Sequence, residues 1–257
     1  MAIRNSIVRF LARRGLLVIT KNDPRFDDIP KNLDPAFPPI VEACSPFTMT
    51  TLQSQYGLWK AVEYVVKCDI PGDIVECGVW KGGSVMIAAN ALKQFGDQSR
   101  RIYLYDTFEG MTEPGPRDID FAGRTPQDHL RGWNANSISE LARSPIDEVK
   151  RNVFSTGLPE NRFVFVKGKV EDTIPGTLPP GPISILRLDT DWFDSTWHEL
   201  VHLYPRLSPG GVLIIDDYAM WKGSHEATDK YFEQERVKML LNRLDYTGAV
   251  IGVKPSA

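Results

Sequence analysis

Along this chain, segments with apolar residues at helical spacing alternate with short continuous apolar runs. Apolar residues recur at helical spacing between Thr50 and Lys67, which predicts a helix over about residues 50–67. Apolar runs that predict strands follow, and helical patterns over about 83–95 and from about 194 lie between them. The runs are DIVEC (73–77), RIYLYD (101–106), RFVFVKG (162–168), PISILRLDT (182–190) and GGVLIIDDY (210–218). Strands that alternate with helices predict an α/β fold with a mostly parallel sheet.

Three segments fall outside this alternation. The first residues of the chain predict an amphipathic helix with a basic face. Residues 20–47 are rich in Pro and Asp and lack periodicity, so they predict an extended arm that follows this helix. We therefore divide the chain into residues 1–47, a helix and arm, and residues 48–257, a single domain. Residues 107–158 are long and irregular, and we expect a lid over the site at about 110–155. Two β-prone runs around LDYTG predict a closing hairpin.

Composition and charge narrow the class of protein. With 257 residues, 42% of them hydrophobic and 25% charged, the chain has the composition of an ordinary globular protein. Its net charge of −3 argues against a nucleic-acid partner. The three cysteines form neither a zinc pattern nor a disulfide framework, so we expect a cytoplasmic protein. The N-terminal helix is too polar to span a membrane, although its basic face could touch a membrane surface or a partner.

A glycine-rich turn follows the first predicted strand. Glu76 ends that strand, and Gly78, Gly82 and Gly83 precede a helix, so the backbone can approach a ligand closely at the start of the helix. The spacing is not GxGxxG, which argues against a dinucleotide, and a plain tight turn is the alternative. Asp106 ends the next strand, at the interval where an acidic residue meets ribose hydroxyls in nucleotide folds. Glu76 and Asp106 should therefore face one crevice.

Four aspartates follow two later strands. Asp189 and Asp191 come after one apolar run, and Asp216 and Asp217 come after the next. In open α/β sheets, ligands bind at this edge of the sheet. Carboxylates so close together would repel each other, and a hard cation such as Mg²⁺ would relieve the repulsion. The alternative is that each aspartate only caps the following helix. Asp191 could act as a general base or could merely support the site.

Aromatic residues and histidines near strand ends are candidates for substrate contact. Trp192, Trp221 and His225 could contact a sugar or an aromatic ring, although packing at the rim of the site explains the tryptophans equally well. His198 and His202 stand four residues apart on a predicted helix, but no glutamate completes a zinc motif. We therefore interpret these two histidines as surface residues.

Several of these motifs occur together in one known family. The segments VECGVWKGGS, YLYDTFEGM, KGKVEDTIP, LRLDTDWFDST and LIIDDY, in this order, resemble the macrocin O-methyltransferase family between about Thr48 and Phe232. The resemblance implies a Rossmann-like class I methyltransferase fold, with a seven-stranded, mostly parallel sheet, a C-terminal antiparallel hairpin and helices on both faces. It also implies Mg²⁺-dependent methylation of a sugar hydroxyl by S-adenosylmethionine, in a homodimer or higher homo-oligomer.

The resemblance also implies roles for individual residues. It assigns the metal to Asp189, Asp216 and Asp217, and the general base to Asp191. It also implies positions that bind S-adenosylmethionine. Thr48 and Met49 belong to the segment that closes over the methionine part, and Glu76, Gly78 and Ser84 hold that part. Asp106 binds the ribose, Val170 and Glu171 border the adenine, and Asp189 lies next to the metal.

Other functions remain open at this point. The same metal chemistry would serve a catechol or another phenol, because a diol chelates Mg²⁺. A binding protein that has kept the nucleotide fold without turnover is a second alternative, and a hydride-transferring Rossmann enzyme is a third. We expect a sugar of a glycosylated natural product or of a polysaccharide as the acceptor.

Overall fold

The computed structural model describes residues 33–130, 132 and 136–256. The chain divides into one unit of residues 1–38 and one of residues 39–257. The predicted N-terminal helix and most of the predicted arm lie outside the described residues. Among the described helices, none is long and apolar enough to cross a membrane.

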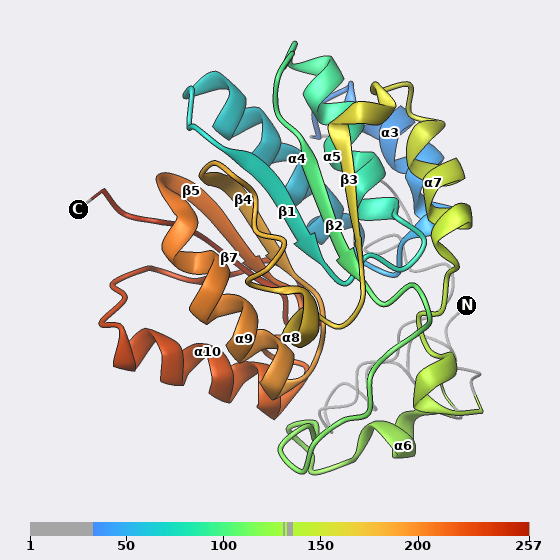
Figure 1. Ribbon diagram of the computed structural model, residues 1–257, viewed down its shortest axis with the longest axis vertical. Coiled ribbons are helices and arrows are strands. Elements are labelled where there is room, and N and C mark those ends of the chain that lie inside the picture. Colours follow the sequence, from blue (N-terminus) through green and yellow to red (C-terminus); the bar gives the residue numbers. More distant parts are fainter. Residues whose placement is uncertain (1–32, 131, 133–135, 257) are drawn as a thin grey trace, which may run out of the picture. The chain divides into compact units, whose positions relative to one another are not determined.

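A seven-stranded sheet forms the centre of the second unit (Figure 1). Its strand order is β3-β2-β1-β4-β5-β7-β6. The pairs from β3 to β5 are parallel, whereas β7 runs antiparallel to both of its neighbours, β5 and β6. The strands are β1 (Asp73–Cys77), β2 (Ile102–Asp106), β3 (Phe163–Lys167), β4 (Ile183–Leu188), β5 (Leu207–Ile215), β6 (Asn242–Arg243) and β7 (Val250–Val253). The sheet confirms the predicted class I fold with its C-terminal hairpin.

Helices cover both faces of this sheet (Figure 1). On one face α4 packs against α5 and α5 against α7, and on the other α9 packs against α8 and α10. The helices are α3 (Phe37–Cys44), α4 (Leu52–Lys67), α5 (Gly83–Gln94), α6 (Pro126–His129), α7 (Ile146–Phe154), α8 (Val170–Thr173), α9 (Phe193–Leu203) and α10 (Lys222–Gln234). Short 3₁₀ turns are η1 (Ser45–Phe47), η2 (Ile138–Glu140), η3 (Glu160–Arg162) and η4 (Tyr204–Arg206).

Two elements differ from the sequence-based expectation. The extended conformation predicted for residues 20–47 is wrong at its C-terminal end, where α3 begins at Phe37. Pro38 and Pro39 lie in the first turn of α3, where a missing N–H does no harm, so prolines that indicated an arm instead start a helix. β5 begins at Leu207 and not at Gly210, because its first residues pair with the start of β4.

The alternation of side chains along β1 and β4 separates apolar from charged residues. Val75 and Cys77 of β1 and Leu186 of β4 belong to the apolar core beneath α9 and α10. Successive residues of a strand point to opposite faces, so Glu76 and Arg187 point to the other face of the sheet. These two residues are direct cross-strand partners in the β1–β4 register.

Asp245, between β6 and β7, joins the C-terminal hairpin to the start of α4. Its Oδ2 accepts hydrogen bonds from Thr51 Oγ1 at 2.6 Å and Ser54 Oγ at 2.7 Å. Its Oδ1 accepts hydrogen bonds from Thr247 Oγ1 and from the N–H groups of residues 247–249. Burial opposes ionisation of this carboxyl group, but the hydrogen bonds outweigh burial and lower its pKa.

We predict that Asp245→Asn lowers the free energy of unfolding at pH 7 by about 2 kcal/mol, because the charged acceptor of these hydrogen bonds is lost. A carboxyl group with a lowered folded-state pKa stabilises fully above its unfolded-state pKa of about 3.9, and this contribution disappears as the pH falls through the folded-state pKa. The difference between variant and wild type should therefore stay nearly constant from pH 7 to about pH 5 and shrink as the pH falls below about 4 in urea titrations. Exposed Glu233 of α10 supplies the control, Glu233→Gln, and a difference that is independent of pH would contradict the prediction.

Candidate active site

A cavity of about 700 Å³ opens at the C-terminal ends of the parallel strands. A cavity of this size suits a small molecule or cofactor. Its wall brings together most of the residues that the sequence singled out, namely Thr48, Met49, Glu76, Gly78, Ser84, Asp106, Val170, Glu171, Asp189, Asp191, Asp216, Asp217 and Trp221.

The glycine turn after β1 lies directly against the end of β4. Gly78 has a φ of 81°, and its N–H donates to the carbonyl oxygen of Tyr105 at 2.8 Å. A Cβ atom at this position would lie 1.9 Å from the carbonyl oxygen of Asp189. A larger residue would therefore push apart the two strand ends that carry Glu76 and Asp189. Gly82, with a φ of 88°, then starts α5 in the left-handed conformation.

Asp106, at the end of β2, holds this turn in place. Its Oδ2 accepts hydrogen bonds from the N–H groups of Val79 at 2.6 Å and Trp80 at 3.1 Å, and its Oδ1 accepts one from the N–H of Phe108 at 2.6 Å. Burial nevertheless raises its pKa. Thr107 Oγ1 also lies 3.4 Å from Asp106 Oδ1, but its single proton is better placed for the carbonyl oxygen of Gly110 at 2.6 Å. One of the about four acceptor positions of the Asp106 carboxylate is therefore available to a ligand hydroxyl.

The buried guanidinium of Arg187 connects three carboxylates. Its Nη1 donates to Glu76 Oε1 at 2.9 Å and to Asp189 Oδ2 at 2.6 Å, and its Nη2 donates to Asp216 Oδ1 at 2.7 Å. Only 3% of the side chain is exposed, and the three carboxylates raise the Arg187 pKa against the effect of burial. Arg187 thus places one fixed positive charge between the glycine turn and the strand-end aspartates.

Arg187 was not among the candidate residues predicted from the sequence, although the sequence carries a signal for it. A charged residue inside a strand that is otherwise apolar is rare in a parallel sheet, whose strands are covered on both faces. Charged residues are almost never fully buried unless they are paired, so Arg187 indicates buried acidic partners. The expected repulsion among the acids is therefore partly compensated within the chain.

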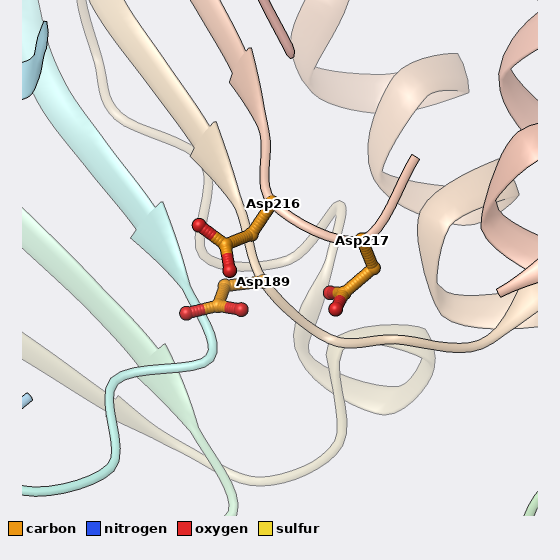
Figure 2. A group of neighbouring side chains, drawn as sticks. All are labelled: Asp189, Asp216 and Asp217. Carbon is orange, nitrogen blue, oxygen red and sulfur yellow. The ribbon is translucent and has the colours of Figure 1, made fainter. Parts of the chain in front are cut away.

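Three aspartates converge next to this guanidinium (Figure 2). One carboxylate oxygen from each of Asp189, Asp216 and Asp217 lies within 4.8 Å of the others, and this is the one group of potential metal ligands found among the described residues. Arg187 engages one oxygen of Asp189 and one of Asp216, which leaves the second oxygen of each for another ligand. Oxygen donors in this arrangement suit a hard divalent cation.

The crowding of acids in the cavity changes their ionisation. Burial, reinforced by the nearby Asp189 charge and opposed by Arg187, raises the pKa of Asp216 to about 7. Burial, together with Asp191, raises the pKa of Asp217 well above its usual range. Burial also raises the Glu76 pKa to about 8. A bound cation would reverse these shifts, since a nearby positive charge favours the ionised form.

Asp191 lies beside this group of aspartates but does not belong to it. It adopts a φ of 67°, and its Oδ1 accepts a hydrogen bond from Trp221 Nε1 at 3.0 Å. Burial and the Asp189 charge raise its pKa to about 8. Asp191 does not cap α9, whose N-cap is Trp192 without a side-chain hydrogen bond. The structure likewise shows no side-chain cap at the start of α10, so the capping alternative does not account for these aspartates.

Glu199 of α9, which was not among the candidate residues predicted from the sequence, supports the loop that carries Asp189 and Asp191. Thr190 donates through Oγ1 to Glu199 Oε1 of α9 at 2.9 Å. Glu199 is fully buried, and burial raises its pKa well above the usual range. This contact joins residues nine positions apart, and no motif in the sequence indicated it.

The expected substrate residues have different positions. Trp221 reaches the cavity wall, but its indole N–H already binds Asp191. Trp192 is buried, and its N–H donates to the carbonyl oxygen of Thr112 at 2.9 Å. His225 lies between Tyr218 and Asp229 on α10. Trp192 and His225 are not among the residues that line the cavity.

Comparisons with known proteins show the family to which the chain belongs. The family model of macrocin-O-methyltransferase (TylF) matches residues 34–251. A Streptomyces olivaceus protein, 8-demethyl-8-(2,3-dimethoxy-alpha-L-rhamnosyl)-tetracenomycin-C 4'-O-methyltransferase, is 36% identical over 78% of this chain and 73% of its own. The mycinamicin III 3''-O-methyltransferase of Micromonospora griseorubida is 32% identical over 78% of this chain and 76% of its own.

Solved structures extend the comparison to the fold. The O-methyltransferase NovP is 29% identical and superimposes with a TM-score of 0.71, over 82% of this chain and 83% of its own. An O-methyltransferase from Bacillus cereus, solved in complex with SAH, shares the fold at 14% identity and a TM-score of 0.53, over 91% of this chain and 97% of its own. The chain therefore belongs to the macrocin-O-methyltransferase family and is an S-adenosylmethionine-dependent O-methyltransferase.

Proposed function

We propose that this enzyme methylates a hydroxyl group on the sugar of a glycosylated small molecule and that the reaction depends on Mg²⁺. The observation that carries the proposal is the group formed by Asp189, Asp216 and Asp217, which adjoins the glycine turn in one cavity. The name of the Streptomyces olivaceus relative, which specifies a rhamnosyl-tetracenomycin, supports a sugar as the acceptor.

In this proposal the chain binds S-adenosylmethionine along the glycine turn. Glu76, Gly78 and Ser84 hold its methionine part, and Thr48 and Met49 close over that part. Asp106 accepts hydrogen bonds from the ribose hydroxyls, while Val170 and Glu171 border the adenine. All these residues line the same cavity, which lies between the ends of β1 and β2 and the start of α5.

Asp191 is the proposed general base. As the acceptor oxygen bonds to the methyl carbon, the carbon–sulfur bond breaks, its electron pair goes to sulfur, and the hydroxyl proton passes to Asp191. A divalent cation held by the three aspartates would make the acceptor hydroxyl more acidic. Arg187 keeps Asp189 and Asp216 in place for this cation, and the cavity walls orient the reactants.

The acceptor class can be tested with a panel of glycosides. We expect transfer of labelled methyl groups from S-adenosylmethionine to rhamnosylated and macrolide glycosides, and no transfer to the same aglycones without their sugar. Mass spectrometry of the released sugar should place the methyl group on it. Methylation of a simple catechol with no methylation of any sugar would contradict the proposal and would favour the phenol alternative.

We predict that Asp217→Asn lowers kcat on the order of 100-fold, because the metal group loses one negative charge. Unlike Asp189 and Asp216, Asp217 does not contact Arg187, so this variant leaves the Arg187 ion pairs intact. Calorimetry should show unchanged binding of S-adenosylhomocysteine. Chelation by EDTA should abolish wild-type activity, and added Mg²⁺ should restore it. Exposed Glu226 of α10 provides the control Glu226→Gln, and full activity of Asp217→Asn without metal would refute the metal role.

We predict that Asp191→Asn lowers kcat by about 10²–10⁴-fold, the usual effect of losing a general base. The amide carbonyl can still accept the Trp221 N–H, so the loop should keep its conformation. Steady-state kinetics should show KM values for both substrates within about twofold of the wild type. An unchanged kcat would exclude Asp191 as the base.

A further inference from the structure

The side chain of Trp221 lies between Asp191 and the segment that contains Asp120 and His129. Trp221 precedes α10, and only 1% of it is exposed. Its Nε1 donates to Asp191 Oδ1 at 3.0 Å, and both residues line the cavity. Asp191 has a φ of 67°, a conformation that aspartate tolerates better than most residues, so the backbone turns its carboxylate toward the indole. The N–H group of Trp221 therefore fixes one oxygen of the proposed base.

The backbone around Trp221 pairs with a distant part of the chain. We define the lid segment as residues 112–129. Asp120 and Trp221 form an antiparallel bridge, and the N–H of Lys222 donates to the carbonyl oxygen of Ile119 at 2.9 Å. The lid segment thus contacts the backbone on both sides of the Trp221 Cα atom.

Two side chains, His129 of the lid segment and Trp192 at the N-cap of α9, pack against the Trp221 ring. His129 packs edge-on against the indole, with ring centroids 5.6 Å apart and an interplanar angle of 89°. His129 Nε2 in turn lies 3.0 Å from Asp120 Oδ2, which also accepts a hydrogen bond from Arg124 Nε at 2.7 Å. The ring of Trp192, the residue before α9, also packs against the indole, with ring centroids 5.4 Å apart. The orientation of the indole therefore depends on the position of the lid segment.

A buried carboxylate fastens the lid segment to the starts of α9 and α10. Asp118 is 2% exposed, and its Oδ1 accepts the N–H of Phe193 at 2.8 Å while its Oδ2 accepts the N–H of Gly115 at 2.6 Å. A Cβ atom at Gly223 would lie 1.8 Å from Asp118 Oδ1, so glycine at the first turn of α10 makes room for this carboxylate. The contacts around Trp221 are thus part of a tightly packed interface.

We propose that Trp221 is a positioning residue for methyl transfer. Its N–H holds Oδ1 of Asp191 at 3.0 Å and so fixes the direction in which this carboxylate faces the cavity, where it accepts the proton of the acceptor hydroxyl. Packing of the lid segment on the indole ring sets this orientation. The inference rests on the proposed function, because it gives Trp221 no role unless Asp191 acts as the base.

Trp221→Phe tests the proposal, since phenylalanine keeps an aromatic ring in the same space but cannot donate a hydrogen bond. We expect kcat to fall about 10-fold or more while the KM values for S-adenosylmethionine and acceptor stay within about twofold, as for an interaction needed only for the chemical step. The control is Trp197→Phe in α9, whose ring packs against Phe193 and Tyr231 and should leave kcat unchanged. Equal kcat values for Trp221→Phe and the wild type would overturn the proposal.

A double-mutant cycle separates positioning from a general structural effect. If Trp221 acts through Asp191, adding Trp221→Phe to Asp191→Asn should cause no further loss of residual turnover. If the two losses multiply, Trp221 acts independently of Asp191 and the proposal fails. Full turnover of Asp191→Asn alone would instead refute the proposed base, and so the failure of the two proposals can be told apart.

A second variant keeps the test decisive if Trp221→Phe does not fold. Asp120→Ala removes the carboxylate that holds His129 and Arg124, and so loosens the packing on the indole from the lid segment. We expect the same pattern of lowered kcat with little change in KM, and unchanged binding of S-adenosylhomocysteine. A raised KM with unchanged kcat would show that the lid segment only encloses the acceptor, and would overturn the positioning role.

Discussion

One buried guanidinium organises the charges of this active site. Arg187 contacts Glu76, Asp189 and Asp216, which come from three adjacent strands of the sheet. A buried carboxylate without a partner is costly, and removing one partner of a buried ion pair typically destabilises a protein by about 3–5 kcal/mol. Because Arg187 supplies the fixed positive charge, these acids can stand close together in the folded chain. The remaining negative charge is what makes the group suitable for a divalent cation.

The sheet register explains why a single side chain can serve both halves of the site. Glu76 and Arg187 are cross-strand partners, and Arg187 also pairs in register with Ile214 of β5, two residues before Asp216. Gly78 lets the turn after β1 lie against the carbonyl oxygen of Asp189. The glycine turn and the group of three aspartates therefore share one wall of the cavity, as a reaction between two bound molecules would require.

The acceptor side depends on contacts of a different kind. There the lid segment lies on Trp221, and Trp221 holds Asp191 through one hydrogen bond. Asp118 binds the N–H group at the start of α9 and packs closely against Gly223 in the first turn of α10. The acids of the metal group are thus fixed by the sheet, whereas the proposed base is fixed by a loop.

The sequence by itself determined the sheet and its C-terminal hairpin, and most of the candidate residues that it singled out line the cavity. Hydrophobic periodicity and acidic strand ends are local properties, and in a parallel sheet all strand C-termini meet at one edge. Only the tertiary structure decided which partners Arg187 has, that Trp221 binds Asp191, and that Trp192 and His225 do not line the cavity. These contacts join residues far apart in the chain, through strand register and loop packing that no local pattern encodes. The start of α3 within a proline-rich segment was missed because proline disfavours a helix everywhere except in its first turn.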